Sequence, residues 1–197
     1  RSLKQITDQP LGVSNLILSP DGKRLAFSME VFVDCPDTEC TEKRMKEIEE
    51  RKTTGIVFDK LFIRHWDTWK DGRRSHLFLM SLNEKQAKDL MPDMDADTPS
   101  KPFGGPEEIV FAPDNKGLVF TARDAGRSEP WSTNFDLFFS PIDGSKVPEC
   151  LTKANEAWDT NPVFSPDGKT LAYLAMKRPG YESDRLRIVL RSWPGGE

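Results

Sequence analysis

The fold is decided by one stretch, Ser165-Pro166-Asp167-Gly168-Lys169-Thr170-Leu171-Ala172-Tyr173-Leu174, which occurs three times with small changes. The other two copies are residues 19–28 and 112–121, and each follows an apolar run. Proline at the second turn position presets φ, and the Asp-Gly or Asp-Asn pair accepts the positive φ of a tight turn. Large side chains then alternate along the chain, as in a strand. The stretch therefore predicts a repeated β-hairpin.

The distances between the copies predict a β-propeller. Pro113 and Pro166 lie 53 residues apart, whereas Pro20 and Pro113 lie 93 apart, which is one unit plus an insertion of about 40 residues. Four short antiparallel strands at this period form a propeller blade. We therefore expect an all-β partial propeller of about two and a half blades with a short helical insertion. The expected ranges are 13–93 for blade 1 with its insertion at 34–72, 106–153 for blade 2, and 158–197 for an incomplete blade 3.

An open ring of this kind has consequences for the surface. A blade without a neighbour exposes the apolar residues that a neighbour would bury. In the third blade we expect such exposure at Val163, Phe164 and Leu171, and we expect the chain to form oligomers or to aggregate.

Composition limits the classes of partner. Of the 197 residues, 37% are hydrophobic and 30% are charged, and the net charge is -4 with both signs interspersed. No basic face is evident, which argues against a nucleic-acid partner. No apolar run is long enough to cross a membrane. His65 and His76 have no metal-ligand spacing, so we expect no metal and no cofactor.

The insertion contains two cysteines and a predicted helix. Thr41 is expected to cap the helix, which should end near residues 53–55. Cys35 and Cys40 are five apart, which suits a small disulfide and is wrong for a zinc knuckle. Two free thiols fit the sequence equally well. The cysteine spacing therefore favours an oxidising compartment for this protein but does not establish one.

The most aromatic part of the insertion is the one candidate binding surface. Two indoles beside an arginine and an aspartate suit a peptide ligand. The alternative is that the aromatic rings pack the insertion onto the propeller while Asp67 pairs with Arg64 or Lys70. The candidate substrate-binding residues are Arg64, His65, Trp66, Asp67 and Trp69.

No catalytic residue is predicted in this chain. A hydrolase nucleophile needs Gly-x-Ser-x-Gly, and the sequence lacks it. Its nearest match, residues 126–130, ends in proline, so Ser128 is interpreted as an ordinary loop serine. The acidic segment 93–97 is interpreted as a solvated turn.

The repeat Ser-Pro-Asp-Gly-Lys-x-Leu-Ala-Phe resembles the WD40-like propeller repeat of the prolyl oligopeptidase family, and also that of TolB-type periplasmic propellers. The insertion distinguishes the two. Residues 35–37, 40–41 and 58–72 resemble the first blade of bacterial acylaminoacyl-peptidase-like and dipeptidyl-peptidase-V-like enzymes.

The resemblance implies a serine exopeptidase or dipeptidyl peptidase that acts on short peptides. In that family the propeller lies over an α/β-hydrolase domain with a Ser-Asp-His triad, restricts access to it and helps to bind substrate N-termini. The hydrolase domain is absent here, so this chain alone should be inactive. The implied partners are short peptides, the remaining blades and the hydrolase domain. The implied location is periplasmic or secreted, with the cytoplasm as the alternative. A TolB-like propeller that serves as a non-enzymatic interaction module is the alternative function.

Overall fold

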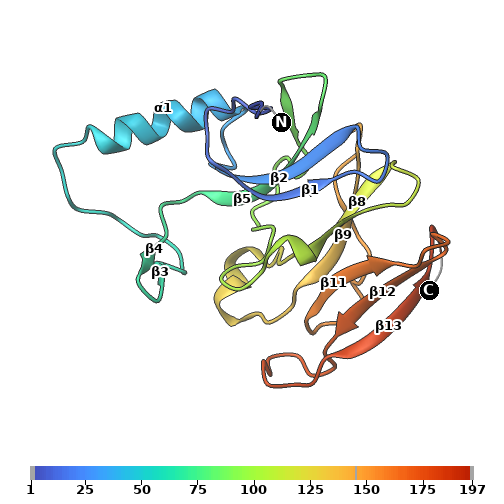
Figure 1. Ribbon diagram of the computed structural model, residues 1–197. Helices are drawn as coiled ribbons and strands as arrows, with labels where there is room; N and C mark the ends of the chain where they lie inside the picture. The colour runs from blue at the N-terminus through green and yellow to red at the C-terminus, as the bar shows by residue number, and fades with distance from the viewer. Residues whose placement is uncertain (1–2, 145, 196–197) are drawn as a thin grey trace.

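The computed structural model describes residues 3–144 and 146–195, in which three larger antiparallel sheets and one two-stranded sheet form (Figure 1). The first has the order β1-β2-β5-β6, the second β10-β9-β8-β7 and the third β11-β12-β13. The strands of the first sheet are β1 (Val13–Leu18), β2 (Arg24–Val31), β5 (Arg74–Ser81) and β6 (Ala87–Asp89). Those of the second are β7 (Ile109–Phe111), β8 (Gly117–Ala122), β9 (Asp136–Pro141) and β10 (Glu149–Cys150). The third contains β11 (Asp159–Phe164), β12 (Thr170–Ala175) and β13 (Arg187–Ser192).

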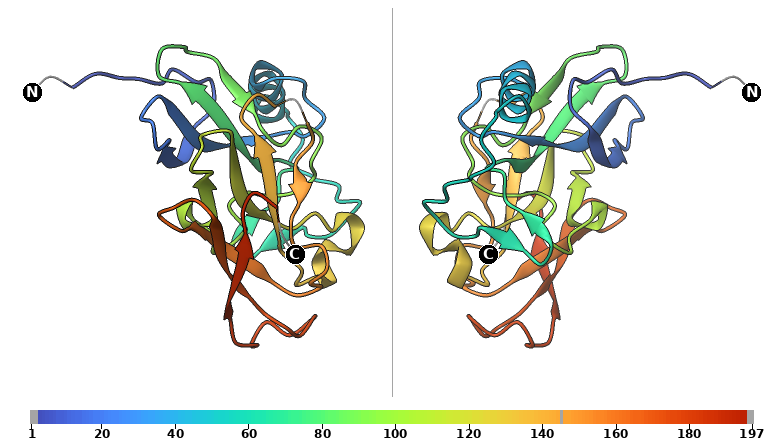
Figure 2. Two further views of the ribbon diagram at one scale, coloured as in Figure 1. Left: turned by 90° about the vertical axis from the view of Figure 1, so that its right-hand side faces the viewer. Right: turned by 90° about the vertical axis from the view of Figure 1, so that its left-hand side faces the viewer.

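The remaining elements lie between these strands. The insertion of the first sheet holds α1 (Thr38–Glu49) and a small hairpin of β3 (Arg64–His65) and β4 (Thr68–Trp69). Two 3-10 helices, η1 (Pro106–Glu108) and η2 (Gly126–Trp131), flank β7 and β8. Figure 2 shows α1 and the β3–β4 hairpin at different heights outside the sheets.

The repeated hairpins form as their turn residues predict. Gly22, Asn115 and Gly168 occupy the same turn position with φ of 68°, 58° and 69°. In the first copy the Ser19 hydroxyl donates to Asp21 Oδ1 at 2.6 Å and accepts from the backbone N–H of Arg24 at 2.9 Å. The third copy repeats this arrangement around its own serine. Each turn is thus fixed by residues within it, which explains why the sequence alone predicts it.

The sheets stack in sequence order, and two apolar cores join them (Figure 1). Leu77 of the first sheet packs with Leu118 and Phe120 of the second, and all three are fully buried. Leu171 of the third sheet packs with Val119 and Leu137 of the second. The chain is therefore an all-β partial propeller whose blades are held by interdigitated apolar faces.

The outer face of the third sheet is exposed, although its pattern differs from the expectation. Val163, Ile188 and Leu190 are 59%, 76% and 68% exposed. Leu171, by contrast, is fully buried, so the expectation of exposure was wrong for this residue. Because side chains alternate along β12, Leu171 points back to the second sheet. Phe164 is half-buried in the same core.

The capping residue of α1 also differs from the expectation. Asp37 is the N-cap, and its side chain accepts from the backbone N–H of Cys40 at 2.7 Å. Thr41 lies inside the helix, fully buried, where its hydroxyl accepts from the backbone N–H of Phe32 at 3.3 Å. The helix ends at Glu49, before the predicted stop. Thr41 therefore joins the helix to the end of β2.

The thiols of the insertion are joined. Cys35 and Cys40 form a disulfide that closes the loop leading into α1, whereas Cys150 is free and half-buried.

Candidate functional site

The aromatic segment forms the β3–β4 hairpin, which projects from the sheets (Figure 1). Arg64 pairs with Trp69 and His65 with Thr68, which leaves a two-residue turn. The first turn residue, Trp66, has φ of 50°, as a two-residue hairpin turn requires. The indoles of Trp66 and Trp69 are 68% and 58% exposed. The tip of the hairpin therefore presents two tryptophans to solvent.

Ring contacts connect the hairpin to its surroundings. The Trp66 ring lies 5.1 Å from the ring of His65 and 5.3 Å from that of Phe103, centroid to centroid. The Arg64 guanidinium lies 5.7 Å from the Trp69 ring centre. Sequence reasoning missed Phe103, which follows the acidic segment and is itself 70% exposed.

The expected pairing of Asp67 with Arg64 or Lys70 is wrong. Lys70 instead pairs with Asp97 at 3.2 Å. Within the described residues, no ion pair includes Asp67. The Asp67 carboxylate is exposed at the hairpin tip, beside the two tryptophans.

A buried arginine anchors the base of this hairpin. Arg74, the first residue of β5, is only 7% exposed. Its guanidinium reaches Asp95 Oδ1 at 2.7 Å, Asp97 Oδ2 at 2.9 Å and Glu129 Oε2 at 2.7 Å. Burial opposes the charge, but the hydrogen bonds with Glu129 and the nearby carboxylates raise the pKa of Arg74 above its usual value. The arginine therefore ties the first sheet to η2 of the second.

The segment 93–97 is part of this anchor rather than a solvated turn. Asp97 is 7% exposed and accepts from the backbone N–H of Ser75 at 2.9 Å. Burial acts to raise its pKa, but Lys70, Lys101 and Arg74 outweigh burial and lower it to about 2. The cost of burying this carboxylate is thus offset by several cations.

Two lysines connect the hairpin to the anchor. Lys60 pairs with Asp95 at 3.0 Å before the hairpin, and Lys70 pairs with Asp97 after it. The backbone N–H of Lys70 also donates to Ile63 O at 3.0 Å, which closes the base of the hairpin. The base is consequently fixed, while the aromatic tip is largely exposed.

Arg123 of the second sheet faces the same region. Its guanidinium lies 5.8 Å from the ring of Phe62 and 4.6 Å from that of Phe135, and 3.6 Å from Glu129. Burial lowers the pKa of Arg123, which the Glu129 charge partly counteracts. Aromatic rings, guanidinium groups and carboxylates can bind a peptide without covalent chemistry.

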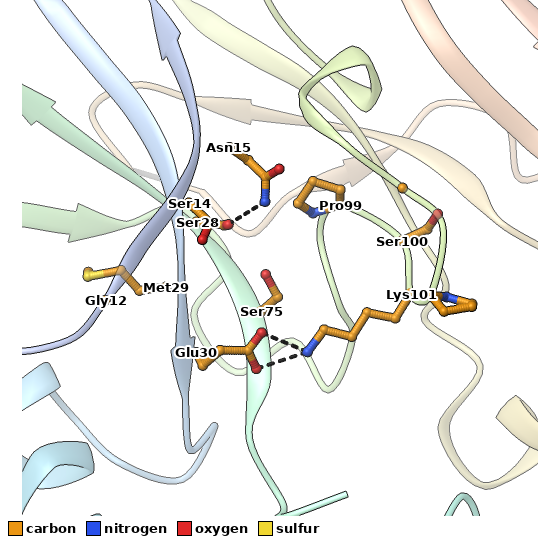
Figure 3. A pocket seen from close by; sticks show the side chains of 12 residues that line it. Gly12, Ser14, Asn15, Ser28, Met29, Glu30, Ser75, Pro99, Ser100 and Lys101 are labelled. Atoms are coloured by element: carbon orange, nitrogen blue, oxygen red, sulfur yellow. Dashed lines mark hydrogen bonds and ion pairs between the residues drawn. The ribbon is translucent and has the colours of Figure 1, made fainter. Parts of the chain in front are cut away.

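A small polar pocket adjoins the anchor (Figure 3). It has a volume of about 210 Å³ and lies between β1, the end of β2 and the loop at 99–104. Lys101 Nζ closes one side through Glu30 at 2.7 Å and also reaches Asp97 at 3.3 Å. Among the other residues that line the pocket, Asn15 Nδ2 donates to Ser28 Oγ at 2.8 Å. The pocket offers hydroxyl and amide groups to a small polar ligand.

The remaining sequence candidates have structural partners. Ser128 lies in η2, where its hydroxyl donates to Ala125 O at 2.7 Å. His76 is buried in β5, with Nδ1 2.8 Å from Asp89 Oδ2 and Nε2 2.9 Å from Met94 O. Across residues 3–144 and 146–195, no group of three or more His, Cys, Asp or Glu side chains could hold a metal ion. In the same part of the chain, no helix has the length and apolarity to cross a membrane.

Three stacked sheets, with an anchored hairpin inserted in the first, define a β-propeller segment. Dipeptidyl-peptidase 5 of Porphyromonas endodontalis is 31% identical over 191 residues, which cover 95% of this chain and 26% of that protein. Dipeptidyl-peptidase 5 of Porphyromonas gingivalis is 29% identical over 192 residues, with 94% and 27% covered. That of Arthroderma otae is 34% identical over 159 residues, with 72% and 22% covered. The chain thus spans about a quarter of the length of the two bacterial relatives.

The solved structures support the fold. TolB from Acinetobacter baumannii matches with a TM-score of 0.51 at 17% identity, over 98% of this chain and 33% of that one. No family model matches the sequence. The chain is therefore related to dipeptidyl peptidases in sequence and is similar to TolB in fold.

Proposed function

We propose that this chain is the N-terminal propeller segment of a serine dipeptidyl peptidase of the prolyl oligopeptidase family, and that it gates the access of short peptides to a hydrolase domain. The observation that carries the proposal is the similarity to dipeptidyl-peptidase 5 over 95% of the chain, which takes in the insertion. The names of these relatives favour dipeptidyl activity over acylaminoacyl-peptidase activity.

Within this proposal the hairpin contacts the peptide. The support is geometric, because the exposed indoles stand on a base fixed by Lys60 and Lys70. A fixed base lowers the ordering cost of binding, and exposed indoles supply contact area. The peptide-contacting residues would be Arg64, His65, Trp66, Asp67 and Trp69.

The proposed setting is an exported protein. The Cys35–Cys40 disulfide supports it, since disulfides persist mainly in oxidising compartments. The partners would be the remaining blades, the hydrolase domain and short peptides.

A second candidate function is a non-enzymatic propeller that docks proteins. The observation behind it is the fold, which is similar to that of TolB. The full-length reading frame separates the two, because only the peptidase requires a nucleophile motif after the propeller.

The test uses the full-length protein and this chain in parallel. Full-length protein should release dipeptides and react with a serine-directed phosphonate, while this chain should do neither. Trp66→Ala should raise KM for a dipeptidyl substrate several-fold with little change in kcat. The reason is that the indole would bind the substrate and the transition state equally well. The matched control is Tyr181→Ala, an exposed aromatic in the third sheet's loop. Stoichiometric labelling of Ser128 in this chain, or an unchanged KM in Trp66→Ala, would contradict the proposal.

A further inference from the structure

A second groove lies on the side of the first sheet that faces away from the second sheet. It has a volume of about 440 Å³, within the range of roughly 300–1,000 Å³ typical of ligand sites. Its apolar floor includes Val31 and Phe78, which are 5% and 4% exposed. One wall is the N-terminal arm at 8–10, and the other is the disulfide loop with the first residues of α1. None of the residues discussed for the hairpin lines it.

The charge at the rim of this groove is negative. Four carboxylates and one lysine line it, namely Asp8, Asp37, Glu39, Asp89 and Lys85. The N-terminus of α1 would by itself attract an anion, but the cap Asp37 and Glu39 of the first turn already occupy that end. Asp8 and Glu39 are exposed, and no ion pair within the described residues includes either of them. The rim therefore favours a cationic ligand.

The groove also runs along a free strand edge. β6 is the last strand of its sheet, and among the described residues no strand pairs with its outer edge. The backbone N–H of Leu90 donates to Leu77 O at 2.9 Å, and the register places Lys88 opposite Leu79. Hydrogen-bonded pairs alternate along an antiparallel ladder, so Ala87 and Asp89 turn their backbone groups outward. Both residues line the groove.

We propose that this groove binds an extended peptide segment that adds a strand to β6 and carries an apolar residue with Lys or Arg two positions away. Residues two apart on a strand share a face, so both side chains would enter the groove together. The apolar side chain would cover Phe78 and Ala87, and the basic one would lie near Asp8 and Glu39. Backbone pairing gives affinity in such complexes and the pockets give sequence preference.

The test measures the binding of labelled peptides by fluorescence anisotropy. The probes are acetyl-Thr-Val-Thr-Lys-Thr-amide and its counterpart with Glu in place of Lys, so that terminal charges play no part. The Kd of the basic peptide should be about fivefold or more below that of the acidic one. Added salt should remove that difference. The double variant Asp8→Asn with Glu39→Gln should also remove it. The matched control is Glu84→Gln, an exposed acid just before β6 that does not line the groove.

A second variant tests the strand addition. Proline is tolerated on an edge strand where the N–H faces outward, so Ala87→Pro should fold while losing an outward donor. This variant should weaken the binding of the basic peptide about tenfold. Thermal unfolding of each variant checks the fold. If Ala87→Pro does not fold, the double variant Asp8→Asn with Glu39→Gln remains the test of the proposal. Equal affinity for the two peptides, no binding of either, or unchanged binding in a folded Ala87→Pro would overturn the proposal.

Discussion

Replacing the buried Asp159 by asparagine should stabilise the chain at alkaline pH. Asp159 is fully buried at the start of β11, in the contact between the second and third sheets. Its Oδ1 accepts from Asn155 Nδ2 at 2.9 Å, while its Oδ2 has no hydrogen-bond partner. Burial, with a contribution from the Asp136 charge, raises its pKa to about 7, and the hydrogen bond from Asn155 only partly opposes this.

The sign and the size of the effect follow from this pKa. The folded state holds the proton of Asp159 up to about pH 7, whereas the ordinary value is 3.8. The stability that the protonated group contributes is complete below that ordinary value and is lost as pH rises through 7. The shift of this pKa from 3.8 to about 7 corresponds to roughly 4 kcal/mol in the free energy of unfolding. Asparagine carries no charge at any pH, so Asp159→Asn should exceed the wild type by up to about 4 kcal/mol above neutrality and match it near pH 4.

Urea unfolding followed by tryptophan fluorescence between about pH 4 and about pH 8.5 measures the effect. The matched control is Glu156→Gln, which removes an exposed acid of the same loop and should show the wild-type profile. The reasoning is refuted if Asp159→Asn is less stable than the wild type above neutrality, or if the difference between them does not grow with pH.

Three further predictions concern the anchor, the exposed sheet and the disulfide. Arg74→Met should cost about 3–5 kcal/mol in urea unfolding because it removes the buried guanidinium that bonds both Asp97 and Glu129, whereas the exposed Arg51→Met should cost almost nothing; equal losses would contradict the anchor. Ile188→Lys should lower self-association in sedimentation, because Ile188 lies on the bare face of the third sheet; an unchanged sedimentation profile would show that this face does not drive association. Mass spectrometry without reductant should find Cys35 and Cys40 bridged, and free alkylation of both would contradict the disulfide.

The sequence predicts the parts of this fold that depend on neighbouring residues. The hairpin turns at 19–28, 112–121 and 165–174 are fixed by proline, a hydroxyl or small residue and a residue with positive φ. Strand alternation and the spacing of the copies then determine three sheets in series. The sequence also marks the aromatic segment as distinct, but it does not predict that residues 64–69 form the β3–β4 hairpin.

The candidate site depends on contacts between distant residues. Arg74 meets Asp97 and Glu129, which are 23 and 55 positions away. In the sequence, Asp97 and Glu129 are indistinguishable from solvated acids.

Local chemistry therefore determined the strands, the turns and the insertion of this protein, since each turn satisfies its own hydrogen bonds. Tertiary structure decided the rest. Stacking of the sheets buried Leu171 and left Ile188 exposed, although both are apolar strand residues. It also placed Phe103 beside Trp66 and raised the pKa of Asp159 by burial. The physical reason is that burial and electrostatic partners are set by which faces meet, and strand alternation leaves two faces to choose from.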